Sequence, residues 1–204
     1  GPHHHLSLRA ADAAAAAIDD HGRTEARDRQ ATAELKRLLR LDTVPRRIEG
    51  FDISNILGNQ SVASLVVWED GQAKKSDYRK FRIQTVEGAN DFASMQEAVM
   101  RRYGATEDLA RPDLILIDGG LGQLSAALEG LKQVGQDQIP IMGLAKARGE
   151  KEERIFLPGR KNPIVLRPTS PATHLVQRIR DEAHRFALRG VIQPCPEEQR
   201  QEHQ

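Results

Sequence analysis

One stretch constrains the fold more than any other: the apolar run LILI at positions 114–117, which ends in Asp118, Gly119 and Gly120. The run does not alternate between apolar and polar residues, so a strand formed by it should be covered on both faces. Helical spacing precedes the run at 90–104 and follows it at 121–135, and a second apolar strand pattern, IPIMGLAK, occupies 139–146. This order of helix, strand, helix and strand is typical of parallel strands joined by crossover helices.

Three further strand patterns come before this unit. They are RRIEGFDIS at 46–54, SVASLVVWED at 61–70 and SDYRKFRIQT at 76–85, and a turn at Asp70-Gly71 separates the last two. Short connections of this kind favour an antiparallel meander. The sequence therefore predicts an α/β fold with a mixed sheet, in which a three-strand antiparallel meander joins parallel strands and helices flank the sheet.

The chain is expected to divide into three parts. Residues 1–44 would hold a tag remnant and a helical lead-in, with Ala31, Leu35, Leu38 and Leu39 at helical spacing. Residues 45–190 would form the folded domain, and the polar residues 191–204 a disordered tail. The histidines at positions 3–5 could belong to the tag, so they are left out of any metal-site argument.

The second half of the domain carries a charged segment, a hairpin and a helix. KARGEKEER at 146–154 has no periodicity and predicts a surface loop whose role is not readable. A hairpin is expected around Pro158-Gly159. The helix that follows should begin with Ser170 as N-cap and Pro171 in its first position, and it should end near Leu188.

Charge and cysteine content bound the class of protein. Lys and Arg number 30 against 29 for Asp and Glu, so no global excess of basic charge indicates a nucleic-acid partner, and none excludes one. A single cysteine, Cys195, rules out an internal disulfide framework, and no apolar run reaches the roughly 20 residues that span a bilayer. We expect a soluble, cytoplasmic protein with no membrane partner.

Two strand patterns end in an aspartate, Asp52 in GFDIS and Asp118 in LIDGG. If their strands are adjacent and parallel, the two carboxylates emerge side by side at one edge of the sheet. Carboxylates that close repel one another unless a cation lies between them, and Mg²⁺ or Mn²⁺ prefers oxygen ligands. Gly119 and Gly120 would leave room for a substrate phosphate. The alternative is that Asp118 only caps the next helix and the two glycines form an ordinary turn.

His184 offers a third ligand. On the predicted helix, Thr173, Gln177, Arg180 and His184 form a polar stripe, while Leu175, Ile179, Ala183 and Phe186 form the core stripe. An imidazole facing away from the core could complete a three-ligand site or transfer protons, and Arg180 could contact a phosphate. The alternative is a solvated histidine without a ligand.

Other polar residues have weaker indications. Asp91 opens a helix, where an acid usually acts as a cap or first-turn residue. Lys146 follows a strand and could touch a phosphate or only face solvent. The basic residues of the third meander strand and the turn before it are more typical of a solvated face than of a DNA groove: Lys74, Lys75, Arg79, Lys80 and Arg82. The sequence has no GxxxxGK phosphate loop, no paired CxxC and no GxSxG elbow.

Taken together, five blocks of the sequence resemble one family: RIEGFDIS, SDYRKFRI, RPDLILIDGGLGQLSAALE, IMGLAK and SPATHLVQRIRDEAHRFA. They resemble the C-terminal endonuclease half of UvrC, the excinuclease subunit of bacterial nucleotide excision repair, over about residues 45–188. The resemblance implies an RNase H-like fold and places the family's catalytic trio on Asp52, Asp118 and His184. A further acid of the family aligns with Asp91.

The resemblance also implies a function and its partners. The family cuts the damaged DNA strand on the 5′ side of a lesion, with a divalent metal ion, in a complex prepared by UvrA and UvrB. Lys146, Arg180, Gly119 and Gly120 would lie against the DNA. The GIY-YIG nuclease, the UvrB-binding region and the helix-hairpin-helix module of the family are not visible in this sequence, so we expect an excised fragment that binds DNA weakly and cuts little alone.

Two other readings stay open at the level of sequence. The domain could be a catalytically silent RNase H-like module that docks DNA or UvrB. It could also be a related enzyme with another substrate, such as a Holliday-junction resolvase or a transposase nuclease, although the block HLVQRIRDEAHRFA argues against this.

Overall fold

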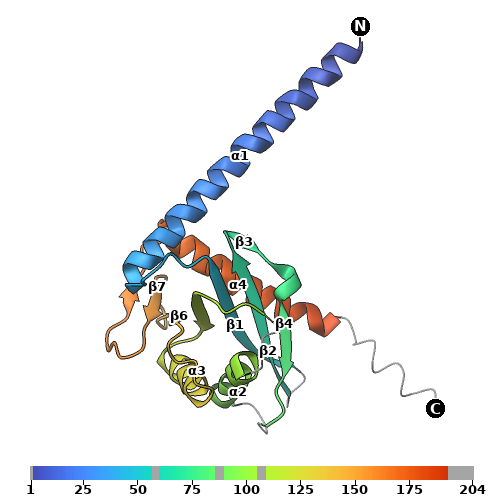
Figure 1. The fold of residues 1–204 in the computed structure, drawn as a ribbon. Helices are drawn as coiled ribbons and strands as arrows, with labels where there is room; N and C mark the ends of the chain where they lie inside the picture. The colour runs from blue at the N-terminus through green and yellow to red at the C-terminus, as the bar shows by residue number, and fades with distance from the viewer. Residues whose placement is uncertain (1, 57–59, 86–89, 105–108, 193–204) are drawn as a thin grey trace, which may run out of the picture.

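A computed structural model describes residues 2–56, 60–85, 90–104 and 109–192. Most of these residues form one layered unit, from which a long N-terminal helix projects (Figure 1). In chain order the elements are α1 (Pro2–Leu39), β1 (Arg47–Ile56), β2 (Gln60–Glu69), β3 (Gln72–Ala73), the 3₁₀ turn η1 (Lys75–Asp77), β4 (Arg79–Arg82), α2 (Asp91–Gly104), β5 (Leu114–Asp118), α3 (Leu121–Gln133), β6 (Ile141–Lys146), β7 (Glu153–Phe156), β8 (Ile164–Val165) and α4 (Pro171–Ile192).

Within the described part of the chain, the strands form one mixed sheet in the order β3-β2-β1-β5-β6-β7-β8, and β4 also pairs with β2. Strands β1, β2 and β4 form the predicted antiparallel meander. Strand β5 lies parallel to β1 on one side and to β6 on the other, as the crossover helices require. The predicted mixed α/β sheet is confirmed, while the short β3 and η1 were not predicted.

Two apolar cores lie on opposite faces of the sheet. Helices α2 and α3 cover one face, and α4 crosses the other face with the end of α1 packed against it (Figure 1). Because successive side chains on a strand point to opposite faces, β5 contributes Leu114 and Leu116 to the α4 side and Ile115 and Ile117 to the α2 side. Burial of LILI on both faces explains why it does not alternate.

A buried ionic cluster fastens α2 to the sheet. Glu49 on β1 has no exposed surface, and its carboxylate accepts hydrogen bonds from Arg47 Nε at 2.9 Å, Arg102 Nε at 2.9 Å and the Tyr103 hydroxyl at 2.8 Å. A buried carboxylate is tolerated when donors of this kind surround it.

Side chains cap the starts of helices α2 and α4. The Asn90 carboxamide oxygen accepts a hydrogen bond from Ala93 N at 3.1 Å at the start of α2. The Ser170 hydroxyl oxygen accepts one from Thr173 N at 3.2 Å at the start of α4. These caps satisfy first-turn N–H groups that have no partner within the helix.

The N-terminal lead-in is helical, as predicted, but its end belongs to the core. Ala31, Leu35 and Leu39 are buried against α4, whereas the side chains of residues 8–27 are exposed. The proposed boundary after residue 44 remains a prediction.

The charged segment 146–154 was predicted as a loop and differs in part. Lys146 ends β6, and Glu153 and Arg154 start β7, with Glu153 only 2% exposed. Helix α4 continues to Ile192, past its predicted end near Leu188 and into the first two residues of the predicted tail, 191–204. The rest of that tail lies outside the described residues. Among the helices that the structure describes, none is long and apolar enough to cross a membrane.

Candidate active site

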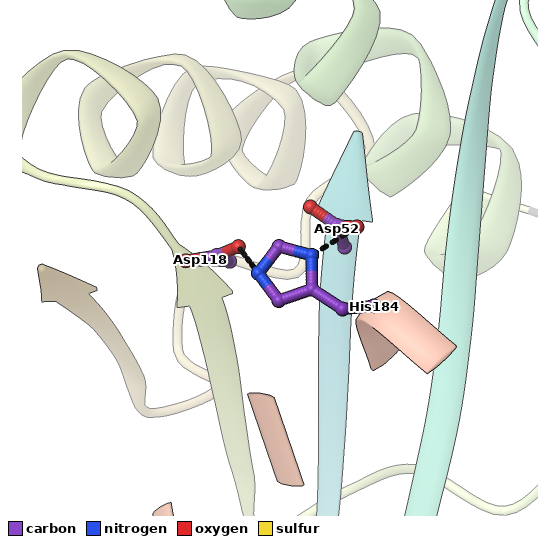
Figure 2. A group of neighbouring side chains, drawn as sticks. All are labelled: Asp52, Asp118 and His184. Atoms are coloured by element: carbon purple, nitrogen blue, oxygen red, sulfur yellow. Dashed lines mark hydrogen bonds and ion pairs between the residues drawn. The ribbon is translucent and has the colours of Figure 1, made fainter. Parts of the chain in front are cut away.

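Asp52 and Asp118 lie side by side, as the strand pattern predicted. Phe51 on β1 pairs with Ile117 on β5, so the next residue of each strand reaches the same level of the sheet. Only β5 ends at its aspartate, because β1 continues past Asp52 to Ile56 in its pairing with β2, so the prediction that both strands end there is wrong for Asp52. Both aspartates point to the face that α4 crosses (Figure 2). Asp52 is buried, and the Asp118 side chain is 20% exposed.

His184 on α4 places its imidazole between the two carboxylates (Figure 2). Nδ1 lies 3.0 Å from Asp52 Oδ2, and Nε2 lies 2.9 Å from Asp118 Oδ2. A neutral imidazole carries one N–H and a carboxylate carries none, so satisfying both contacts requires an extra proton, either on the ring or on one carboxyl group. The imidazole is therefore a partner of both acids, and the solvated-histidine alternative is wrong.

The predicted polar stripe of α4 holds for His184, whose side chain is 51% exposed, but not for Thr173. Thr173 is buried because its hydroxyl donates a hydrogen bond to the Arg167 carbonyl at 2.6 Å in the turn before the helix. The periodicity of a helix does not predict hydrogen bonds of this kind to the preceding turn.

Burial, together with the nearby carboxylate of Asp52, raises the pKa of Asp118 to about 6. The positive charges of His184 and Arg180 act in the opposite direction without cancelling the rise. Ionising both carboxylates is therefore unfavourable when no counter-ion is present, and the ionised site attracts a cation.

Ser54 is a further residue of the site that the sequence analysis did not single out. Its hydroxyl donates a hydrogen bond to Asp52 Oδ2 at 3.3 Å, since residues two apart on a strand share a face. That spacing within GFDIS was the only sequence signal for it.

Gly119 and Gly120 follow Asp118 as a tight connection to α3. Gly119 has φ of 152°, and a Cβ on it would come within 2.6 Å of Gln123 Cβ. The N-cap of α3 is Gly120, which makes no side-chain capping bond, while Asp118 points to His184. The alternative in which Asp118 serves only as a helix cap is therefore wrong.

Arg180 and Lys146, both predicted to contact DNA, share the buried carboxylate of Glu153. Arg180 Nη1 donates to Glu153 Oε2 at 2.8 Å, and Lys146 Nζ lies 3.5 Å from Glu153 Oε1. Glu153 was missed because it stands in a segment without periodicity. These contacts fix Arg180 near Asp118, and DNA binding by the two cations remains a prediction.

Asp91 is not brought together with the other three residues. It opens α2, and its Oδ1 accepts a hydrogen bond from Asn55 Nδ2 at 3.2 Å. Asn55 lies an odd number of positions from Asp52 on β1, and therefore on the opposite face of the strand. Its catalytic role stays a prediction.

The donor atoms suit a divalent cation. Among the residues that the structure describes, Asp52, Asp118 and His184 offer ligand atoms that all lie within 4.8 Å of one another. Two carboxylate oxygens and one imidazole nitrogen fit Mn²⁺ and are compatible with Mg²⁺.

Comparison with known proteins places this chain in a family. A family model described as the UvrC RNase H endonuclease domain matches residues 36–188. The UvrABC system protein C of Acidobacterium capsulatum is 55% identical over 157 residues, which cover 76% of this chain and 24% of that protein. The counterpart from Bdellovibrio bacteriovorus is 49% identical over 165 residues, covering 76% and 26%. The chain thus spans about a quarter of the length of the curated relatives it matches.

Endonuclease V enzymes are among the solved structures to which this chain has a weak similarity. Endonuclease V of Ciona intestinalis, bound to a 24mer DNA containing inosine, has a TM-score of 0.45 and 12% identity, covering 73% of this chain and 87% of that one. The catalytic domain of human endonuclease V has a TM-score of 0.43 and 15% identity, covering 74% and 85%. The family model and the identities to the bacterial proteins are far more specific, and on them the chain belongs to the family of UvrC RNase H endonuclease domains.

Proposed function

We propose that this domain hydrolyses a phosphodiester bond of DNA with a divalent metal ion, and that it makes the 5′ incision on the damaged strand in nucleotide excision repair. The cluster of Asp52, Asp118 and His184 carries the proposal, because it combines two closely placed acids with an exposed imidazole in a family of nuclease domains. The relatives are proteins of the UvrABC system, which supports damaged duplex DNA as substrate and UvrB, with UvrA, as partner.

Asp52, Asp118 and His184 would hold the ion, Mg²⁺ or Mn²⁺. When bound, such an ion polarises a phosphate oxygen and lowers the pKa of water. The chain's own residues position the reaction. Ser54 and His184 fix the Asp52 carboxylate, and the half-exposed imidazole can exchange a proton with solvent.

Gly120 leaves the approach to the site open. Its φ of −87° is ordinary, and the nearest atom to a Cβ built on it is a ring carbon of Phe156, 4.0 Å away. A DNA backbone could therefore come close to Asp118 without meeting a side chain from this turn.

One observation favours a second candidate, a catalytically silent module that docks DNA or UvrB. His184 contacts both acids, so a protonated imidazole could neutralise them without a metal ion and leave a purely structural cluster. The two candidates differ in whether metal binding and strand cutting depend on Asp118.

The test is strand nicking of a lesion-bearing duplex by this chain in the presence of UvrA, UvrB and Mn²⁺. We expect cutting on the 5′ side of the lesion, its loss in EDTA and its loss in Asp118→Asn, with the exposed Asp42→Asn as the matched control. Nicking that persists in Asp118→Asn would refute the assignment of the site. Calorimetric titration with Mn²⁺ provides an independent readout, in which a silent module would bind equally well with and without Asp118.

A further inference from the structure

The edge strand β4 carries two basic side chains in register with the catalytic acid. Lys80 on β4 pairs with Ser64 on β2, which pairs with Asp52 on β1. The next row towards the carboxyl edge joins Arg82, Val62 and Ser54 in the same way. Opposed residues of antiparallel strands project to the same face, so both cations lie on the face that holds the active site.

The strand spacing sets how far these cations lie from the acid. Neighbouring strands are about 4.8 Å apart, so the Cα atoms of Lys80 and Asp52, two strands apart, are separated by about 10 Å. Lys80 and Arg82 are about 6.8 Å from each other along β4, which is similar to the spacing between successive phosphates of a nucleic-acid strand. The pair is thus placed to contact phosphates that flank the scissile one.

The surface between the acid and β4 is open in one row and covered in the other. Ser64 is fully buried, whereas Ser54 and Val62 are only half-buried. A DNA strand could therefore run from Asp52 over Ser54 and Val62 to Arg82. Lys80 lies two residues before Arg82 on the same strand. A small hydroxyl and a β-branched side chain leave this route low enough for a DNA backbone.

The helix that supplies the catalytic imidazole also positions Lys80. Its Nζ lies 4.6 Å from the centroid of the Phe186 ring, two residues after His184 on α4. The Phe186 ring packs on Tyr78 with centroids 5.1 Å apart. A cation over an aromatic face is held in place and keeps its charge, so Lys80 stays available to an anion.

Several other basic residues near this face already form ion pairs with acidic side chains. Arg180 and Lys146 contact Glu153, and Arg185 contacts Glu182. Among the described residues, no carboxylate lies within ion-pair distance of Lys80 or Arg82. Within the described part of the chain their charge is therefore not paired with an acid, as expected of residues that meet a polyanion.

We propose that β4 is a phosphate-binding strand, in which Lys80 and Arg82 contact successive phosphates of a DNA strand that runs from the active site across Ser54 and Val62. The arginine fork suits bidentate contact with a phosphate, and the lysine acts as a point charge. This inference rests on the proposed nuclease function, since it takes DNA as the ligand that crosses the site. It reverses the sequence-based expectation that these residues form a solvated face.

The test measures affinity for a fluorescein-labelled, lesion-bearing duplex by anisotropy, in EDTA so that nothing is cut, at salt from about 50 mM to about 200 mM. Each phosphate contact contributes about 0.9 to the slope of log affinity against log salt concentration. If the contact contributes nothing at about 1 M salt, this slope makes it worth about tenfold in affinity at about 50 mM. We expect Lys80→Gln and Arg82→Gln each to lose about tenfold in affinity at the lower salt, and the double variant to lose about 1.8 from the slope.

Lys132→Gln is the matched control, because Lys132 is exposed near the end of α3, at the edge of the sheet away from the active site. Lys80→Arg should keep the wild-type slope, which separates loss of charge from damage to the packing on Phe186. A double variant with the affinity and slope of the Lys132→Gln control would overturn the proposal. So would failure of the unaltered chain to bind the duplex at micromolar concentration and low salt.

Failure of this inference and failure of the proposed function are distinguishable. If Asp118→Asn abolishes nicking but the double variant binds as the control does, the function stands and the β4 proposal falls. If the double variant loses affinity and slope but no metal-dependent nicking occurs, the β4 surface binds DNA in a module that does not cut.

Discussion

The charge of the active site should oppose folding when no metal ion is bound. Burial and the Asp52 carboxylate raise the pKa of Asp118 from its ordinary value of 3.8 to about 6. The folded chain therefore binds the Asp118 proton more tightly than the unfolded chain does, and stability falls as the pH rises from about 4 through about 6. The difference between these two pKa values corresponds to about 3 kcal/mol of folding stability, which is present below about pH 4 and fully lost above about pH 6.

Asp118→Asn removes this charge in a side chain of nearly the same shape. In EDTA at pH 8 we expect the variant to be more stable than the wild type by up to about 3 kcal/mol, which is about 6–12 °C in Tm for a chain of this size. Near pH 4 the difference should shrink to below about 1 kcal/mol, because the wild-type carboxyl group is then protonated in the folded chain and close to half-protonated in the unfolded chain. Mn²⁺ should raise the Tm of the wild type at pH 8 and leave that of Asp118→Asn nearly unchanged.

Thermal unfolding followed by circular dichroism between pH 4 and pH 8 measures this difference, with Asp42→Asn as a control for removal of an exposed charge. The reasoning is refuted if Asp118→Asn is less stable than the wild type at pH 8 in EDTA. That result would mean that the contact between Asp118 and the His184 imidazole outweighs burial and the repulsion from Asp52, so that the pKa of Asp118 is lowered.

Three further predictions concern packing in the fold and are tested by urea denaturation. Gly119→Ala should cost about 1–3 kcal/mol, because its φ is positive and the added methyl group would clash with the first turn of α3, whereas Gly120→Ala should be tolerated. Arg102→Met should cost about 3–5 kcal/mol, since it removes a guanidinium from the fully buried carboxylate on β1. Leu35→Ala should cost about 2–5 kcal/mol and Ile18→Ala almost nothing, because only the end of α1 packs on α4, and equal effects would contradict this view of the helix.

The sequence predicted the parts of the site that depend on strand order. Asp52 and Asp118 each end an apolar strand pattern, and parallel strands joined by a crossover helix bring such ends together. His184 was predicted to face away from the core, and its half-exposed side chain agrees. Its contact with both acids depends on the angle and position at which α4 crosses the sheet. The periodicity of a single helix does not predict either.

The rest depended on contacts between distant segments. Glu153 is buried because Arg180, 27 positions later, pairs with it. The charged segment around Glu153 was therefore predicted as a loop, although Glu153 lies in a strand. The role proposed for Lys80 depends on strand register, since only the pairing through Ser64 places it level with Asp52. Local patterns state which residues prefer a strand, but register across three strands is set by packing of the whole sheet.

A histidine as the third member of the cluster has an electrostatic consequence. A third carboxylate would add a negative charge to a site where the pKa of Asp118 is already raised, and would raise the cost of the metal-free state. The imidazole can instead carry the shared proton and contact both acids while no ion is bound. A cation between Asp52 and Asp118 must compete with those contacts, so we expect weaker metal affinity than three carboxylates would give, together with a fold that survives without metal. On the outer strand, Lys80 and Arg82 have no acidic partner among the described residues, and by our proposal they would attract the DNA strand independently of the ion.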